Sequence, residues 1–359
     1  MEKLPIFAEY SQLEGRLPWI ELGKFPTPVE RLTHLNHPGI WIKRDDISSE
    51  LYGGNKVRKL EFSLAQILSQ KKKHVITIGG IGTNHGLATA IFCQQLGLKC
   101  TLLLFRQPVT RFVKQNLKLF HYYGAELIFK GSLLNTALHY GLFQRLVYPR
   151  ANFLYAGGSS VEGTIGFVNA AFELKAQVNQ GLLPEPDLIF CPLGTNGTLV
   201  GLTLGVRLAG LKSRVVGVRI TTAKLGPLNV ANETAASNLM KAVYRRLKDS
   251  IDNCPTVSLK PPEILHQYMG DGYGHPTEKG REACQLVKEN ENITLDPVYT
   301  SKAFAAILEY CEQPANASQN ILYWHTYNSI DLSKEAESVD YQELPKPFHR
   351  FFLMKEQPI

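Results

Sequence analysis

The chain has 359 residues, of which 44% are hydrophobic and 20% are charged, and its net charge is +7 at pH 7. This is an ordinary globular composition, and so modest a charge favours a small anionic ligand but does not indicate nucleic acid. No apolar run reaches the roughly 18 residues of a membrane span, and residues 1–10 lack the features of a signal peptide. The six cysteines include no CxxC pair, which argues against a zinc site or a disulfide framework. We therefore expect a cytoplasmic protein without a metal.

In chain order, short apolar stretches alternate with helical patterns. Strands are predicted over 40–43, 74–78, 100–105, 126–129, 188–191, 215–220 and 321–324, and helices over 61–69, 87–96, 113–123, 199–208 and 235–247. This alternation predicts an α/β fold with mostly parallel sheets flanked by helices. The length favours two domains, and we expect residues 331–359 to form a surface appendage.

The first unusual segment is Gly53-Gly54-Asn55-Lys56, which precedes a helical pattern. Two glycines and an asparagine permit a tight turn, so the lysine projects from a defined position. A desolvated lysine can lose its proton and form a Schiff base with an aldehyde cofactor. The alternative is an ordinary loop with solvated lysines. Neighbouring Lys59 is expected on the helix surface or in a supporting position.

The second segment is the turn over 79–86, which contains Thr83, Asn84 and His85. It lies between a predicted strand and a predicted helix, and the free N–H groups of a helix N-terminus bind anions. Thr83 and Asn84 are also typical helix-capping residues, so capping is an alternative interpretation.

The third segment is Gly194-Thr195-Asn196-Gly197-Thr198, again between a strand and a helix. Its glycines permit close backbone approach and its helix N-terminus favours a phosphate monoester. It lacks the Lys-Ser/Thr ending of a nucleotide-binding P-loop and the spacing of a dinucleotide site. A tight turn with polar filler is the alternative. Because both turns lie at the carboxyl ends of strands, a lysine, an anion site and a phosphate cradle together indicate pyridoxal phosphate.

At this point the chain resembles a known family, from about residue 22 to residue 326. The matching motifs are Phe25-Pro26-Thr27-Pro28, Lys43-Arg44-Asp45-Asp46, 53–61, 78–85, Gly157-Gly158-Ser159-Ser160, 194–198, Gly272-Tyr273-Gly274 and 295–300. Together they resemble the 1-aminocyclopropane-1-carboxylate deaminase/D-cysteine desulfhydrase family of fold-type II (tryptophan synthase β-like) pyridoxal phosphate enzymes. The resemblance implies two domains, a large cofactor-binding domain (1–59 and 172–359) and a small substrate-carboxylate-binding domain (60–171), in a homodimer.

The resemblance also implies roles for individual residues. Lys56 would be the catalytic Schiff-base lysine, Gly194, Thr195, Asn196, Gly197 and Thr198 would cradle the phosphate, Asn84 would bond the phenolic oxygen, and Thr326 would contact the pyridine nitrogen of the cofactor. Thr83, Asn84 and His85 would bind the substrate carboxylate, and Tyr273 and Tyr299 would face the substrate as catalytic residues. Without the resemblance, each tyrosine reads as an aromatic residue packed near a strand end.

Details of the motifs bear on the substrate. Thr300 and His85 resemble the desulfhydrases rather than the deaminases, so we expect β-elimination from a D-amino acid such as D-cysteine, giving pyruvate, sulfide and ammonia. Thr83 replaces the usual serine, and Tyr327-Asn328 replaces the usual glycines after Thr326. Two alternatives therefore stay open: a 1-aminocyclopropane-1-carboxylate deaminase, and a protein that binds pyridoxal phosphate without turnover.

Overall fold

The structure is a computed structural model that describes residues 3–225 and 228–357, apart from the side chains of 143–145. Two compact units emerge, one of residues 1–62 and 159–329 and one of 63–158 and 330–359. Within the described residues, no helix is both long and apolar enough to cross a membrane.

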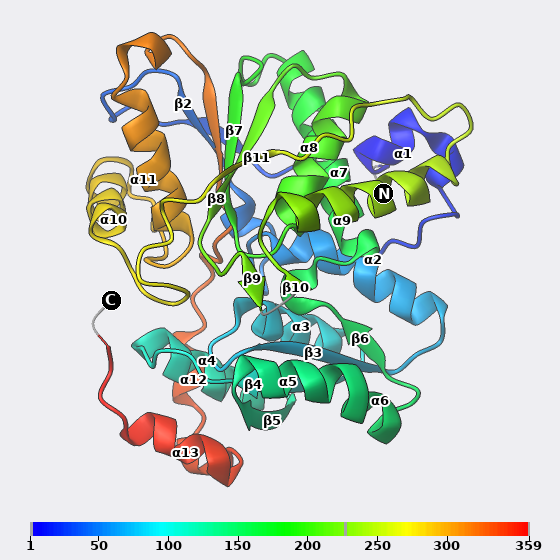
Figure 1. Ribbon diagram of the computed structural model, residues 1–359, viewed down its shortest axis with the longest axis vertical. Helices are drawn as coiled ribbons and strands as arrows, with labels where there is room; N and C mark the ends of the chain where they lie inside the picture. The colour runs from blue at the N-terminus through cyan, green and yellow to red at the C-terminus, as the bar shows by residue number, and fades with distance from the viewer. Residues whose placement is uncertain (1–2, 226–227, 358–359) are drawn as a thin grey trace. The chain divides into compact units, whose positions relative to one another are not determined.

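The first unit is built on a six-stranded sheet (Figure 1). In sheet order its strands are β1 (Val29–Arg31), β2 (Ile40–Lys43), β12 (Ile321–Trp324), β7 (Leu188–Leu193), β8 (Arg214–Arg219) and β11 (Glu263–Leu265). Only the pairing of β1 with β2 is antiparallel. The carboxyl ends of the five parallel strands therefore lie along one edge of the sheet.

Helices cover both faces of this sheet. Figure 1 draws α10 (Glu278–Glu291) and α11 (Thr300–Cys311) on one side, and α7 (Val161–Asn179) and α8 (Gly197–Ala209) on the other. Side chains of β12 alternate between the two cores, because successive residues of a strand point to opposite faces. Its Ile321 and Tyr323 join the α10/α11 core, while its Leu322 and Trp324 join the α7/α8 core. Among its described residues, this unit also contains the α-helices α1 (Pro5–Glu9) and α9 (Glu233–Lys248) and the strands β9 (Lys224–Leu225) and β10 (Leu228–Asn229).

The second unit has a four-stranded parallel sheet. Its order is β5 (Glu126–Gly131), β4 (Lys99–Phe105), β3 (His74–Gly80) and β6 (Asn152–Leu154). The helices are α3 (Asn84–Gln95), α4 (Arg111–Tyr122), α5 (Leu133–Leu138), α6 (Gln144–Val147), α12 (Ser333–Glu337) and α13 (Lys346–Leu353). Helix α2 (Lys56–Ser69) crosses the boundary between the units. The predicted α/β class with mostly parallel sheets therefore agrees with both units.

Two features differ from the sequence-based expectations. The helix predicted over 61–69 begins at Lys56, so this lysine is its first residue. The long helices α10 and α11 are absent from the sequence-based predictions, and so is α7. Most of its residues are buried, so it lacks the alternation of polar and apolar faces that reveals a surface helix.

The tail is a third difference. Residues 330–357 group with the second unit, whereas the family resemblance implied that they belong to the large domain. Helix α13 buries Phe348 and Phe351, whose ring centroids lie 5.9 and 5.3 Å from that of Phe129. Pro347 stands in the first turn of α13, where proline is tolerated.

Candidate active site

The turn that carries Lys56 is bonded to the chain segment that follows β12. The Asn55 N–H donates to the Thr326 carbonyl at 3.2 Å. Gly54 has a φ of +89°, and a Cβ at this position would lie 2.6 Å from the Tyr327 carbonyl oxygen. Glycine is therefore required here both by its conformation and by the close approach of the second backbone. The structure thus brings the predicted residues Lys56 and Thr326 to the same edge of the sheet.

Lys56 lies partly buried at the start of α2. Its Nζ donates to Asn55 Oδ1 at 2.7 Å. Burial lowers the pKa of Lys56 to about 8, although the charge of Asp296 opposes this shift. A substantial fraction of the amine is therefore neutral near pH 8, which is the form that attacks an aldehyde or accepts a proton.

The predicted phosphate turn follows β7 and ends at the start of α8. The Gly197 N–H donates to Ser159 Oγ at 3.0 Å, and this hydroxyl donates to Thr195 Oγ1 at 2.7 Å. A Cβ on Gly197 would lie 2.7 Å from Ser159 Oγ and 3.1 Å from Lys59 Nζ. The turn therefore places backbone N–H groups, hydroxyls and an amine around the N-terminus of a 13-residue helix, which is a favourable environment for an anion.

Lys59 and Ser159 lie next to Gly197 of this turn, and the sequence did not reveal their roles there. Lys59 is only 1% exposed, contrary to a position on the helix surface. Burial, and next the charge of Lys56, hold its pKa well below the usual lysine value. Lys59 follows Lys56 by three positions, and residues three apart share one side of a helix. This spacing could have indicated that the two lysines lie on the same side of α2.

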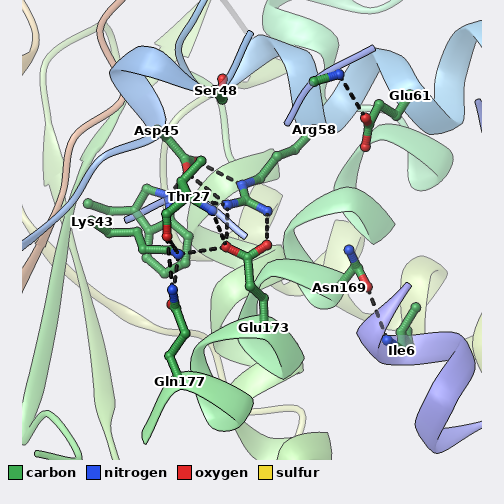
Figure 2. Close-up of polar contacts among 12 residues, drawn as sticks. Ile6, Thr27, Lys43, Asp45, Ser48, Arg58, Glu61, Asn169, Glu173 and Gln177 are labelled. Atoms are coloured by element: carbon green, nitrogen blue, oxygen red, sulfur yellow. Dashed lines mark hydrogen bonds and ion pairs between the residues drawn. The ribbon is translucent and has the colours of Figure 1, made fainter. Parts of the chain in front are cut away.

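A network of buried charges surrounds Arg58, which lies in the first turn of α2 (Figure 2). Arg58 makes hydrogen bonds of 2.8 Å to both carboxylate oxygens of Asp45, and of 2.8 and 3.0 Å to Glu173. Lys43 approaches Glu173 to 2.6 Å. The Asp45 carbonyl accepts the Gly54 N–H at 2.6 Å, so this network also holds the glycine turn.

The two predicted tyrosines are adjacent. The hydroxyl of Tyr299 donates to that of Tyr273 at 2.7 Å, and the rings are nearly perpendicular with centroids 5.9 Å apart. A Cβ on Gly194 would lie 3.2 Å from Tyr299 Cε1, so Tyr299 borders the phosphate turn. Burial raises the pKa of both phenols, and both are therefore neutral at physiological pH.

Asp296 is a further residue that the motif did not explain. One of its carboxylate oxygens accepts the N–H groups of Val298 and Tyr299 at 3.0 and 2.7 Å. The other accepts the N–H and the hydroxyl of Thr300 at 3.0 and 2.6 Å. Asp296 therefore satisfies N–H groups at the start of α11, whose N-cap residue is Tyr299, and orients the segment that carries Tyr299.

Thr83, Asn84 and His85 lie in the second unit, at the start of α3. Thr83 is the helix cap, and its Oγ1 accepts the Gly86 N–H at 3.2 Å. Asn84 is exposed, and its Oδ1 accepts a hydrogen bond from Asn116 at 3.2 Å. His85 is buried. The capping interpretation therefore holds for Thr83, and it is compatible with anion binding by the same helix end.

Comparison with known proteins adds to this geometry. Residues 20–326 match the family model of pyridoxal-phosphate dependent enzymes. The chain belongs to this family.

Individual members are similar over most of their length. A D-cysteine desulfhydrase of Klebsiella pneumoniae (strain 342) is 32% identical over 324 residues, covering 87% of this chain and 94% of the relative. A Thermotoga maritima protein, provisionally named as a 1-aminocyclopropane-1-carboxylate deaminase, is 31% identical over 315 residues, covering 86% of this chain and 95% of its own. A crystal structure of an ACC deaminase homologue has a TM-score of 0.76 and 26% identity, covering 94% of this chain and 99% of that one.

These similarities confirm the predicted fold class, the resemblance to the deaminase/desulfhydrase family, the lyase class of enzyme and the pyridoxal phosphate cofactor. The residues of the first unit fit this cofactor. Lys56, with a pKa of about 8, suits its aldehyde. The N-terminus of α8, where Gly197 leaves space for a close approach, suits its phosphate.

Proposed function

We propose that this pyridoxal-phosphate dependent enzyme catalyses α,β-elimination from a D-amino acid with a β leaving group, such as D-cysteine. The products from D-cysteine and water are pyruvate, sulfide and ammonia. The observation that carries the proposal is Lys56, a lysine with a pKa of about 8 that is linked through Asn55 to Thr198 of the phosphate turn. The similarity to D-cysteine desulfhydrases supports the choice of substrate.

When bound, the cofactor supplies the electron sink for the carbon–hydrogen bond that breaks. As the family resemblance implies, residues 194–198 would hold its phosphate, Thr326 would contact its pyridine nitrogen and Asn84 would bond its phenolic oxygen. Lys56 accepts the α-proton as general base, which its lowered pKa permits near neutral pH. Tyr273 and Tyr299 would face the substrate as neutral phenols, because burial raises the pKa of both.

We assign the substrate carboxylate to Thr83, Asn84 and His85 at the N-terminus of α3. The first unit then has the role of the cofactor-binding domain and the second that of the carboxylate-binding domain. We further propose a cytoplasmic homodimer. All six cysteines are free thiols, which suits a reducing compartment. Measuring the mass of the native protein in solution tests the dimer.

The experiment incubates the cofactor-loaded protein with D-cysteine and measures sulfide, pyruvate and ammonia. Lys56→Ala is expected to abolish all three products, whereas Lys241→Ala, which replaces an exposed lysine of α9, should retain them. A panel of D- and L-amino acids run in parallel identifies the preferred enantiomer and leaving group. Absence of any product from D-cysteine in the loaded wild type would reject this substrate.

A 1-aminocyclopropane-1-carboxylate deaminase is the second candidate, favoured by the similarity to the Thermotoga maritima protein. It predicts 2-oxobutyrate and ammonia from that cyclopropane amino acid. The third is cofactor binding without turnover, suggested by the Tyr327-Asn328 sequence after Thr326. It predicts a borohydride-reducible adduct on Lys56 and no product from any amino acid in the panel.

A further inference from the structure

Asn55 connects the lysine to the phosphate turn, although these segments lie far apart in the sequence. Its Nδ2 donates to Thr198 Oγ1 at 3.0 Å, and its Oδ1 accepts from Lys56 Nζ at 2.7 Å. Its backbone N–H is also bonded, to the Thr326 carbonyl at 3.2 Å. Asn55 and Thr198 are 8% and 2% exposed, so the interaction lies away from solvent.

The chemistry of the amide gives this chain of bonds a direction. A side-chain amide donates only through its nitrogen and accepts only through its oxygen. While the Thr198 hydroxyl accepts from Nδ2, the oxygen of Asn55 must face the other way, toward Lys56. An acceptor beside an ammonium favours its charged form. Thr198 can therefore influence the amine of Lys56 through the orientation of one amide, without touching it.

We propose that Asn55 is a positioning residue that holds the Lys56 amine in place, and that Thr198 of the phosphate turn orients the Asn55 amide for this purpose. The inference rests on the proposed role of Lys56 as the lysine that receives the aldehyde. It further means that the phosphate turn influences this lysine through hydrogen bonds of the protein alone.

Other charged groups near Lys56 stay constant in the variants that test this coupling. Asp296, in the segment before α11, opposes the lowering of the Lys56 pKa. Lys59, one turn further along α2, interacts with the charge of Lys56. Neither residue is altered below, so a change in the titration of Lys56 reports on Asn55 and Thr198.

The experiment follows Lys56 in the full-length protein freed of cofactor, using pyridoxal, which has an aldehyde but no phosphate. The neutral amine condenses with the aldehyde, water leaves, and borohydride then adds hydride to the resulting carbon–nitrogen double bond to give a stable secondary amine. Peptide mass spectrometry measures the initial rate of this adduct at Lys56 as a function of pH. In the wild type the rate should rise with a midpoint near pH 8.

Asn55→Ala removes the acceptor of the ammonium, so the midpoint should fall by about one pH unit, a tenfold change in proton affinity. Asn55→Asp instead places a negative charge there and should move the midpoint upward. Thr198→Val should lower the midpoint pH, whereas Thr198→Ser, which keeps the hydroxyl, should have the wild-type midpoint. The double variant Asn55→Ala with Thr198→Val should have the same midpoint as Asn55→Ala alone. This lack of additivity is the signature of action through Asn55.

Thr203→Val is the matched control. Thr203 is another buried threonine of α8, but its hydroxyl donates to the Leu199 carbonyl within the helix at 2.7 Å. Its loss should leave the midpoint unchanged, and circular dichroism checks that every variant is folded. An unchanged midpoint in folded Asn55→Ala, or additive shifts in the double variant, would overturn the inference while leaving Lys56 in its role. Absence of an adduct on Lys56 in the wild type would overturn that role and this inference with it.

Discussion

Thr300 and Asp296 show how single residues define the segment that carries Tyr299. Thr300 is fully buried, and its hydroxyl donates to an Asp296 carboxylate oxygen and accepts the Asp296 N–H at 2.7 Å. The family resemblance led us to expect that position 300 bears on the choice of substrate. In the structure its hydroxyl bonds to Asp296 at the start of α11. A carboxylate at position 300 would therefore lie against the carboxylate of Asp296.

For Thr300→Val we therefore expect the free energy of unfolding to fall by about 1–3 kcal/mol, because two buried hydrogen bonds are lost and the shape is kept. Denaturant unfolding measures the change. Thr300→Ser, which keeps the hydroxyl, should be close to wild type. If the valine variant is as stable as the serine variant, the threonine does not contribute through its hydroxyl.

The hydrogen-bonded tyrosine pair gives a second prediction for single residues. Tyr299→Phe removes the hydroxyl that bonds to Tyr273, and we expect kcat to fall about 10²-fold, because the proposed mechanism uses this hydroxyl in proton transfer. Steady-state kinetics with D-cysteine measures the effect. Tyr244→Phe serves as control, because the Tyr244 hydroxyl bonds the Pro255 carbonyl at an exposed position. Equal activity of both variants would remove Tyr299 from the proposed chemistry.

At the scale of elements, the site depends on how strands and helices end. Helix α8 begins at Gly197 and α2 at Lys56, and both starts lie beyond the carboxyl ends of parallel strands. Glycines allow these helix starts to approach neighbouring groups closely. The buried network of Lys43, Asp45, Arg58 and Glu173 then joins α2 to β2 and α7.

Gly197→Ala tests the helix start that is proposed to bind phosphate. The added methyl would meet Ser159 Oγ at 2.7 Å and Lys59 Nζ at 3.1 Å, so the turn must shift. We expect the Kd for pyridoxal phosphate to rise about tenfold or more, which absorbance titration measures. Gly141→Ala is the control, since a methyl there meets no atom within 4 Å. Unchanged affinity in Gly197→Ala would place the phosphate elsewhere.

The ionisation of Glu173 allows us to predict how the free energy of unfolding depends on pH. Burial by itself raises its pKa, but the charges of Arg58 and Lys43 overcome this and lower the pKa to about 2. In the unfolded chain this carboxyl has an ordinary pKa near 4.5. Its stabilising effect is therefore complete above about pH 4.5 and is lost as the pH falls toward 2.

We expect Glu173→Gln to lower the free energy of unfolding at pH 6 by about 3–5 kcal/mol, because Arg58 and Lys43 lose a buried partner. The loss should shrink as the pH falls from 4.5 toward 2. Urea unfolding across this range measures it, with Glu282→Gln as an exposed control. A loss that is constant with pH would contradict the assigned pKa.

At the scale of the whole molecule, neither unit is formed by one continuous stretch of the chain. The first unit combines two separated segments, and the tail returns to the second unit. The aromatic side chains of α13 provide the reason, because Phe348 and Phe351 are buried beside Phe129 of β5. The tail is thus an integral part of a hydrophobic core.

Phe348→Ala should accordingly destabilise the protein by about 3–5 kcal/mol, as expected for a buried phenylalanine. Thermal unfolding measures the effect. Leu353→Ala is the control on the same helix, since Leu353 is 78% exposed and should change stability little. Equal melting temperatures for both variants would mean that the tail does not pack as described.

The sequence by itself determined the fold class, the family and the cofactor. These depend on local patterns: strand and helix periodicity, the Gly-Gly-Asn-Lys turn and the Gly194–Thr198 turn, in which neighbouring residues create the chemistry. The tertiary structure decided the buried position of Lys59, the contact of Ser159 with Gly197, and the link from Lys56 through Asn55 to Thr198. Asn55 and Thr198 are 143 positions apart. Such contacts depend on the order of strands in the sheet, and no local pattern of residues specifies that order.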